Sequence, residues 1–342
     1  MTKVAIVILN WNGLKHLRTY LPSVTHYSQG ERIRVIVADN GSTDESLEFI
    51  ASNYPEIEII RLDHNYGFAE GYNQALNNID AEYFVLLNSD VEVTEGWLTP
   101  MIELLDNDQT IAACQPKILS WARKNQFEHA GAAGGFIDKY GYPLCRGRVL
   151  DEMETDHGQY DNKAEVFWAT GACMMIRASL YKEFGGFDKD FWAHMEEIDL
   201  CWRLKNRGYK IYFTPNSIVY HLGGGSLPYN SPHKVYLNFR NNLFMLFKNL
   251  PSRHFYRCIV FRMILDGLAG INFLLEMKWR FLKEVLHAHL DFYRALPVLK
   301  EKRSALEQKR TQQDHPQILQ HSMVRYFFLH KKRKFSDIVT LS

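Results

Sequence analysis

The sequence has few cysteines, no long uncharged apolar run and almost no net charge. Its 342 residues include five scattered cysteines and no C-x-x-C pair. This argues against a disulfide framework and a structural zinc site, and is compatible with a reducing cytosol. No uncharged stretch of about 18 apolar residues occurs, so a membrane-spanning helix is not expected. The chain opens on the strand-like run MTKVAIVILN rather than on a signal peptide.

The formal net charge of +1 conceals an uneven distribution. Of the 40 Lys and Arg residues, 20 lie from Tyr229 onward, where only 8 of the 39 acidic residues are found. The first 228 residues are therefore acidic and the remainder is basic, which indicates two regions with different partners. We expect a catalytic domain over residues 1–228 and a basic, helical region over residues 229–342.

Strand-like and helix-like segments alternate in the first third of the chain. Strands are predicted over residues 3–10, 34–40, 57–62 and 82–88. Helices are predicted over residues 14–24, 44–51, 68–78 and 94–107. Alternation of this kind is typical of βαβ units, and it predicts an α/β fold with a mainly parallel sheet flanked by helices. Residues 115–165 are less regular, and a strand, helix, loop, helix and strand follow them.

A polar cluster follows each of the four predicted strands. In chain order the clusters are NWNG, ADNGSTDES, HNYGFAEG and NSDVE. Each alone has an ordinary structural explanation, since Asp39 and Asn40 can form a turn and Thr43 can cap a helix. Together they fall at one edge of the predicted sheet, where the ligands of open α/β sheets bind. That edge is therefore a candidate nucleotide site.

Seven blocks of the chain resemble glycosyltransferase family 2 in order and spacing: VAIVILNWNG, VIVADNGSTDES, NYGFAEGYNQAL, LLNSDVEV, GACMMIR, GGFD and EEIDLCWRLKNRGY. The likeness covers residues 3–225 and is greatest to rhamnosyltransferase-like bacterial members that build cell-surface polysaccharides. It implies a GT-A (Rossmann-like) fold, a nucleotide-sugar donor, Mg²⁺ or Mn²⁺ as cofactor, and an inverting displacement. Donor binding is expected over about residues 1–115, and the acceptor and catalytic part over about 116–228.

The resemblance also implies which residues contact the donor. Asp39, with Asn40 beside it, matches the acid that recognises the base and ribose. Asp44 matches a second acid of the family, with a first-turn helix acid as its alternative. Asn73 has a capping alternative. The remaining expected donor contacts are Asn10, Gly67, Asn88, Trp168, Gly171 and Arg203.

The NSD tripeptide at residues 88–90 aligns with the family's DxD block, in which an acid binds the metal that neutralises the leaving diphosphate. Such a metal needs oxygen ligands, few protein donors and substrate phosphates. Because Asn88 replaces the first acid, Asp90 is the only acidic ligand of the block, and strict metal dependence is an open question. His221 is expected beside the metal or diphosphate, and a structural histidine is its alternative. The following Gly223–Ser226 could form a phosphate-binding loop.

The catalytic base is expected in the HMEEIDLCWR segment. Inversion needs one carboxylate to remove the proton of the acceptor hydroxyl. Glu197 matches the second position of the family's acidic pair and is the predicted base, with Glu196 as the second candidate. Asp199 and Arg203 are expected to orient the base or contact the donor, with an i,i+4 ion pair on one helix as the alternative.

The C-terminal region is basic, aromatic and amphipathic. Residues 255–300 and the HKKRKF segment predict helices that lie on an anionic membrane surface, where a lipid-linked acceptor would be found. A soluble helical hairpin packed on the catalytic domain is the alternative, and no nucleic-acid-binding module accompanies the charge. The expected location is cytoplasmic, on the inner face of the cell membrane.

The predicted function is transfer of a sugar from dTDP-rhamnose or a UDP-hexose to a glycan or lipid-linked acceptor. A nucleotidyltransferase would need a glycine-rich basic signature near the first strand, and ILNWNGLKHL has none. A catalytically inactive sugar-binding or lipid-binding scaffold remains the alternative. The presence of Asp39, Asp90 and Glu197 together argues against it.

Overall fold

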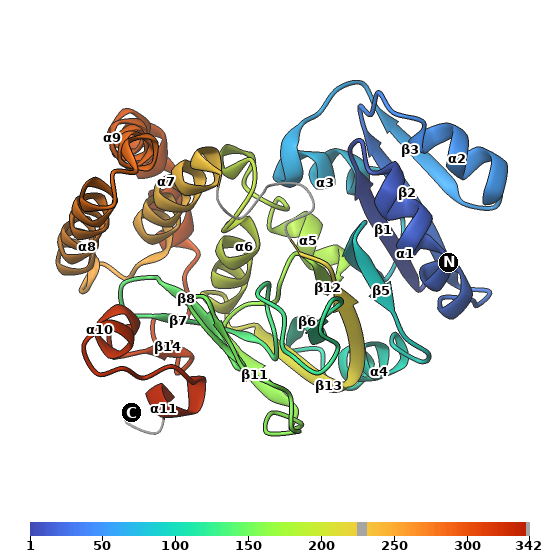
Figure 1. Cartoon of the computed structure of the whole chain (residues 1–342). Helices are drawn as coiled ribbons and strands as arrows, with labels where there is room; N and C mark the ends of the chain where they lie inside the picture. Colours follow the sequence, from blue (N-terminus) through green and yellow to red (C-terminus); the bar gives the residue numbers. More distant parts are fainter. Residues whose placement is uncertain (224–230, 340–342) are drawn as a thin grey trace.

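The computed structural model describes residues 1–223 and 231–339. A nine-stranded sheet runs through the molecule in the order β11-β13-β6-β12-β4-β1-β2-β3, with β5 paired to β13 off this path (Figure 1). Both faces of the sheet are covered. Alternate residues of β1 enter two separate cores, Ala5 and Val7 in one and Val4, Ile6 and Ile8 in the other. This is why β1 is apolar at every position from Val4 to Leu9 rather than at alternate ones.

The first third of the chain forms the alternating units that the sequence predicts. The strands are β1 (Val4–Asn10), β2 (Ile33–Asn40), β3 (Glu58–Leu62) and β4 (Tyr83–Asn88). The helices are α1 (Leu14–Tyr27), α2 (Ser46–Asn53), α3 (Gly67–Asn77) and α4 (Thr99–Asn107). The order β4-β1-β2-β3 is parallel throughout. Helix α4 begins later than predicted, because residues 91–93 form a short extra strand.

The rest of the sheet is mixed. Its strands are β5 (Val91–Val93), β6 (Ile111–Ser120), β11 (Ala164–Val166), β12 (Cys173–Arg177) and β13 (Lys210–His221). Strand β12 runs antiparallel to both of its neighbours, β4 and β6, whereas β13 is parallel to β6. The α/β fold class is confirmed, and the parallel part of the sheet consists mainly of the first four strands.

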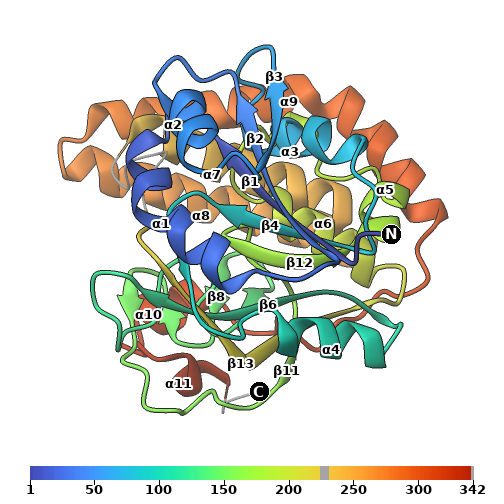
Figure 2. The same cartoon turned by 90° about the vertical axis from the view of Figure 1, so that its right-hand side faces the viewer.

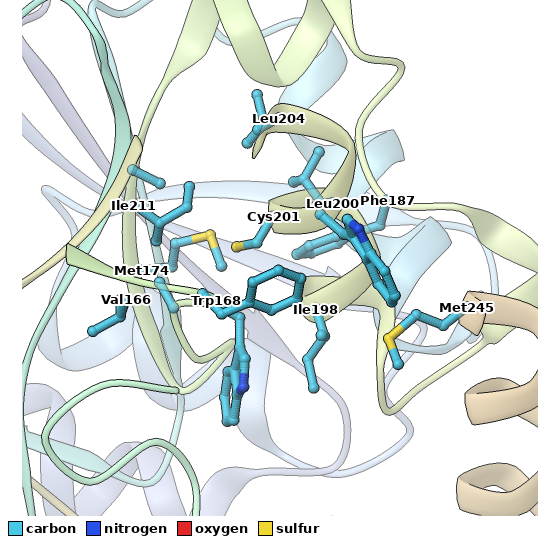
Figure 3. Close-up of a cluster of buried hydrophobic side chains, with 14 of the residues drawn as sticks. Val166, Trp168, Met174, Phe187, Ile198, Leu200, Cys201, Leu204, Ile211 and Met245 are labelled. Carbon is cyan, nitrogen blue, oxygen red and sulfur yellow. The ribbon is translucent and has the colours of Figure 1, made fainter. Parts of the chain in front are cut away.

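Helix α6 (Glu196–Lys205) carries the predicted catalytic segment and packs against the sheet. It follows α5 (Ala178–Glu183) and a short 3-10 turn at Lys189–Phe191. Figure 3 shows Ile198, Cys201 and Leu204 of α6 in one buried cluster with Met174 and Ile211 of the sheet. This apolar anchorage fixes the position of the helix and of the acidic residues in its first turn.

The irregular middle of the chain forms a second, five-stranded sheet in the order β10-β9-β8-β7-β14. Its strands are β7 (Gly135–Asp138), β8 (Pro143–Cys145), β9 (Arg148–Val149), β10 (Glu152–Met153) and β14 (Ile318–Leu319). The excursion of loops and short strands predicted for residues 115–165 is confirmed. Because β14 comes from the C-terminal region and pairs with β7, the two predicted regions share one sheet. The boundary at residue 228 stays a prediction.

The C-terminal region is helical, as predicted. Its helices are α7 (Pro232–Asn249), α8 (Phe255–Leu275), α9 (Trp279–Gln308), α10 (Met323–Phe328) and α11 (Phe335–Val339). Figure 1 shows α7, α8 and α9 grouped at the side of the molecule away from α1 and β3, and Figure 2 shows the same chain from the α1 side. Within the described residues, α8 is the one helix long and apolar enough to cross a membrane, by length and composition only. The lack of an uncharged run therefore does not by itself exclude a span.

Candidate active site

The ends of β1, β2 and β4 meet at one edge of the sheet, as predicted. Asn10 at the end of β1 is paired in register with Asp39 of β2, and Leu9 is paired with Asn88 of β4. The first three polar residues of the candidate site therefore come together because their strands are parallel and in register. This is the edge where open α/β sheets bind ligands.

Asn10 and Asp39 form a buried hydrogen-bonded pair. Asn10 Nδ2 donates to Asp39 Oδ1 (3.2 Å) and to Ser42 Oγ (3.1 Å), and the Ser42 N–H donates to Asp39 Oδ2 (3.1 Å). Both carboxylate oxygens thus have partners, while the buried Oδ1 of Asn10 has none within the described residues. Asn10 positions Asp39, and the recognition of a base or ribose by Asp39 stays a prediction.

Asn40 and Asp44 use their side chains to hold neighbouring loops. Asn40 Nδ2 donates to the Gly67 carbonyl (2.9 Å), and its Oδ1 accepts from the Tyr66 N–H (3.0 Å). Asp44 accepts from the Leu14 N–H (3.0 Å) at the start of α1, where a carboxylate satisfies a free helix donor. Burial would raise the pKa of Asp44, but its hydrogen bonds, led by that of Ser46, lower it overall. For both residues the structural alternative is the better description.

The structure likewise gives Gly67 and Asn73 contacts inside the protein. Gly67 has φ +77°, and a Cβ there would lie 2.6 Å from the Trp192 ring. Asn73 Nδ2 donates to the Phe187 carbonyl (2.8 Å), and its Oδ1 accepts from the Phe187 N–H (3.0 Å) and from Tyr181 Oη (2.9 Å). Both therefore support the loop that leads into α6, and their contact with the donor stays a prediction.

Trp168 lies against β7 of the second sheet, and Gly171 lies beside Phe68 of α3. Trp168 is buried, donates from Nε1 to the Phe136 carbonyl (2.9 Å), and covers the backbone of Gly135. A Cβ on Gly171 would lie 3.2 Å from the ring of Phe68. These contacts fit the predicted wall of a pocket, and a direct contact with the donor stays a prediction.

Asp90, His221 and Glu128 form a buried acidic cluster at the end of β4. His221 Nε2 lies 3.1 Å from Asp90 Oδ1, and its Nδ1 lies 3.0 Å from Glu128 Oε2. Asn88 Nδ2 lies 3.5 Å from His221 Nε2, at the edge of the cluster. The predicted neighbours Asn88, Asp90 and His221 are therefore brought together. Gly224–Ser226 of the predicted phosphate loop lie outside the described residues.

The charges of this cluster depend on one another. Burial alone would lower the pKa of His221, but the carboxylates of Asp90 and Glu128 raise it well above its usual value. Burial would raise the pKa of both carboxyls, and the attraction of His221 instead lowers them. The group is therefore an imidazolium held between two carboxylates, with one negative charge in excess.

Glu128 is the member of the cluster that the sequence did not reveal. It lies in the irregular stretch between β6 and β7, where no periodic pattern or motif marks it. Its carboxylate also accepts from the Ala130 N–H (2.5 Å), which fixes its direction. Only the folding of the chain brings it against His221, a residue 93 positions away in the sequence.

The cluster fits a hard divalent cation in part. Asp90 and the Asn88 amide oxygen would supply ligands, His221 would join them only after losing its proton, and such ions take the remainder from substrate phosphates and water. The excess negative charge also favours a cation. Within residues 1–223 and 231–339, however, no group of three or more His, Cys, Asp or Glu side chains is arranged to hold a metal alone. The donor would therefore complete the site.

Glu196 and Glu197 stand at the first turn of α6, after a backbone segment with unusual geometry. Trp192, His194 and Met195 all have positive φ (63°, 69° and 72°), which is rare outside glycine. The Oε2 atoms of Glu196 and Glu197 are buried and have no hydrogen-bond partner within the described residues. Two unpartnered carboxyl oxygens on a strained turn are typical of a working site rather than of a structural one.

Burial governs the acidity of both carboxyls. It raises the pKa of Glu197 to about 7, against the partial effect of backbone hydrogen bonds. Burial and the neighbouring Glu197 raise the pKa of Glu196 well above its usual value. Glu196 therefore keeps its proton to a higher pH than an ordinary glutamate, while Glu197 exchanges its proton near neutral pH. That is the behaviour a general base requires.

Asp199 and Arg203 belong to an ion network behind the site. Arg203 Nε donates to Asp199 Oδ2 (2.8 Å), and the same carboxylate is bound by Lys248 Nζ (2.9 Å to Oδ1) and Asn249 Nδ2 (2.7 Å). Arg203 also donates to the carbonyls of Phe184 and Gly186 (2.7 Å each). The i,i+4 ion pair is therefore the observed contact, and the buried Oδ1 of Asn249 has no partner within the described residues. Contact with the donor by Arg203, and a catalytic role for Asp199, stay predictions.

Comparison with known proteins identifies the family. A model of glycosyl transferase family 2 matches residues 5–185, more than half of the chain. The chain belongs to this family. The pre-mycofactocin glycosyltransferase of Mycobacterium tuberculosis is 28% identical over 227 residues, which cover 65% of this chain and 42% of that protein. The chain thus matches less than half the length of that relative.

Two further relatives agree with the assignment. The N-acetylglucosaminyl-diphospho-decaprenol L-rhamnosyltransferase of M. tuberculosis is 23% identical over 249 residues, covering 63% of this chain and 75% of that protein. The crystal structure of GalNAc-T7 with UDP, GalNAc and Mn²⁺ superposes with a TM-score of 0.57 at 17% identity, over 75% of this chain and 50% of that one. The family resemblance and the GT-A fold are confirmed.

Proposed function

We propose that this member of family 2 is an inverting glycosyltransferase that uses a nucleotide-sugar donor. The observation that carries the proposal is the carboxyl of Glu197, which has a buried, unpartnered oxygen and a pKa raised to about 7 by burial. It lies on the rigid first turn of α6. His129 follows Glu128 of the acidic cluster, and His194 is close enough to His129 to help lower its pKa. Because His194 comes two residues before Glu196, the start of α6 lies near that cluster.

In this mechanism Glu197 removes the proton from the acceptor hydroxyl. The oxygen attacks the anomeric carbon of the donor sugar as the bond from that carbon to the diphosphate oxygen breaks. Attack opposite the leaving group inverts the configuration. Glu196, held protonated by burial and by its neighbour, does not compete for the proton. A single base of this kind contributes a rate factor of about 10²–10⁴.

Mg²⁺ or Mn²⁺, when bound, would neutralise the charge of the leaving diphosphate. Asp90 is its proposed anchor, with Asn88 and His221 beside it. Asp39, held by Asn10, is proposed to accept from the base or ribose of the donor. GalNAc-T7 was crystallised with UDP and Mn²⁺, and the chain shares its fold. That likeness supports the nucleotide and the metal as working assumptions.

We leave two donors open, dTDP-rhamnose and a UDP-hexose. The rhamnosyltransferase among the relatives favours the first, and the UDP-bound structure favours the second. The same relative is named for a diphospho-decaprenol substrate, so a lipid-linked or glycan acceptor in cell-surface polysaccharide synthesis is proposed for this chain. The reaction is proposed to take place in the cytoplasm, on the inner face of the membrane.

A thermal-shift panel of UDP, dTDP and their sugars with Mg²⁺, Mn²⁺ or EDTA tests the donor site. We expect one nucleotide diphosphate to stabilise the protein in a metal-dependent way, by about 2.7 kcal/mol at 100 times its Kd. Substitution of Asp90 by Ala is expected to weaken metal-supported donor binding roughly tenfold, which is about 1.4 kcal/mol.

The control for this experiment is Asp80→Ala, an exposed acid just before β4 at the opposite edge of the sheet. It should bind the donor as the wild type does. Equal donor affinity of wild type and Asp90→Ala, with and without EDTA, would refute the metal role of Asp90. Metal-independent binding of a sugar or lipid without turnover would instead favour the inactive scaffold.

A further inference from the structure

Helix α8 presents an uncharged apolar face to the solvent. Eight large apolar side chains of α8, each 37–81% exposed, form this α8 face: Tyr256, Val260, Phe261, Ile264, Leu268, Ile271, Leu274 and Leu275. Their spacing of mostly three and four residues places them along one side of the helix. Every exposed position from Val260 to Asn272 is uncharged. An apolar surface of this length on a described face indicates an interaction site.

Two of the three charged residues of α8 are turned inward, and the third, Arg257, lies exposed near its start. Arg262 and Asp266 are buried, and Arg262 Nε donates to Asp266 Oδ1 (2.7 Å). Arg262 also donates to Asn242 Oδ1 of α7 (2.6 Å), and Asp266 Oδ2 lies 3.2 Å from His289 Nε2 of α9. In the sequence these two residues interrupt the apolar run, but in the fold they face the neighbouring helices and leave the outer face free of charge from Val260 to Asn272.

These contacts favour a helix that lies at the membrane surface over one that crosses the membrane. A span would have to take Arg262 and Asp266 away from α7 and α9, or take α9 into the membrane with them. Helix α9 carries Lys283, Asp291 and Arg294 on its surface and is too charged to cross. The packed arrangement in Figure 1, with α8 on the outside of α7 and α9, keeps all of these partners together.

We infer that the α8 face lies in the interfacial layer of an anionic lipid membrane. Exposed cations stand at both ends of the face, Arg257 at the start and Arg280 and Lys283 after the end, where they would meet lipid headgroups. The exposed acid at the end, Glu276, is paired with Lys278 (2.7 Å). A second copy of the chain is a poorer occupant. Two-fold packing in either direction brings cations of one copy against cations of the other. The inference rests on the proposed function only in that a lipid-linked acceptor explains the need for a membrane.

Flotation of the full chain with vesicles tests this inference. We expect it to float with vesicles of phosphatidylcholine and phosphatidylglycerol, less with phosphatidylcholine alone, and to be released by alkaline carbonate. The variant Ile264→Gln/Leu268→Gln/Ile271→Gln removes three half-exposed side chains and is expected to lower partitioning at least roughly tenfold, because each contributes part of its burial free energy. Unchanged melting of the apo protein shows that the variant is folded.

The matched control is Leu286→Gln/Leu290→Gln/Tyr293→Gln, three equally exposed residues of α9 set among charges. It should float nearly as the wild type does. Equal loss in the two variants, or no loss in the α8 variant, would overturn the assignment. So would resistance of the wild type to carbonate, which indicates a span, or a dimer that the α8 variant dissociates. Nucleotide binding without vesicles tests the proposed function separately.

Discussion

Replacement of Glu197 by Gln is expected to reduce sugar transfer by a factor of about 10²–10⁴ while nucleotide-sugar affinity changes little. The amide keeps the size of the side chain and its place on α6 but cannot accept the proton of the acceptor hydroxyl. Initial rates of transfer and donor affinity, both measured on the purified protein, check the two halves of this expectation. The affinity half is expected because Asp90, the proposed anchor of the donor, lies outside α6.

The pH profile gives a second readout of the same group. Glu197 acts as a base only when ionised, and its pKa is raised to about 7 by burial. We therefore expect kcat/KM of the wild type to fall as pH drops below about 7. The residual rate of Glu197→Gln should lack this acidic limb. A wild-type profile that is flat from pH 5 to 8 would contradict the assignment.

Stability should move in the opposite direction to activity. A carboxyl whose folded pKa lies above its unfolded value costs stability progressively as pH rises from the unfolded pKa. Glu197→Gln removes that cost, so the variant should melt at the same or a higher temperature than the wild type above pH 7.

The comparison variant for transfer is Glu196→Gln, which we expect to keep substantial transfer. If Glu196→Gln is inactive and Glu197→Gln active, the roles are reversed.

The first third of the fold was predictable because its signals are local. Four apolar runs followed by polar clusters mark β1 to β4, and their parallel register brings Asn10, Asp39 and Asn88 to one edge. The position of β12, antiparallel between β4 and β6, was not predictable. No residue pattern in these three strands indicates which strand pairs with which. Likewise, the pairing of β14 with β7 joins residues about 180 positions apart.

The candidate site shows the same difference between local signals, which the sequence carries, and long-range contacts, which it does not. Residues at strand ends and in the first turn of α6 were placed correctly by motif and order. Side chains that are satisfied inside the protein were not distinguished from those that are free, because the partner is decided by packing. Asn73 hydrogen-bonds to the Phe187 backbone, and Arg203 pairs with Asp199. Glu128 was missed because its contact with His221 exists only in the folded chain.

The ion network behind α6 leads to the last prediction, a large loss of stability on replacing Asp199 by Ala. Asp199 is fully buried and joins Arg203 of its own helix to Lys248 and Asn249 of α7. Its removal leaves the buried Arg203 without a carboxylate partner and leaves Lys248 with Asp188 alone. Breaking a buried pair in this way typically costs about 3–5 kcal/mol. Urea unfolding of the purified variant measures the effect.

The matched control is Glu276→Ala, which breaks the exposed Glu276–Lys278 pair (2.7 Å) and is expected to cost about 0–1 kcal/mol. Similar losses in the two variants would show that the buried network adds nothing. Asp199→Asn separates structure from chemistry. The amide can still accept from Arg203, so transfer per folded molecule should persist. A loss of transfer in fully folded Asp199→Asn, comparable to that of Glu197→Gln, would return Asp199 to the catalytic group.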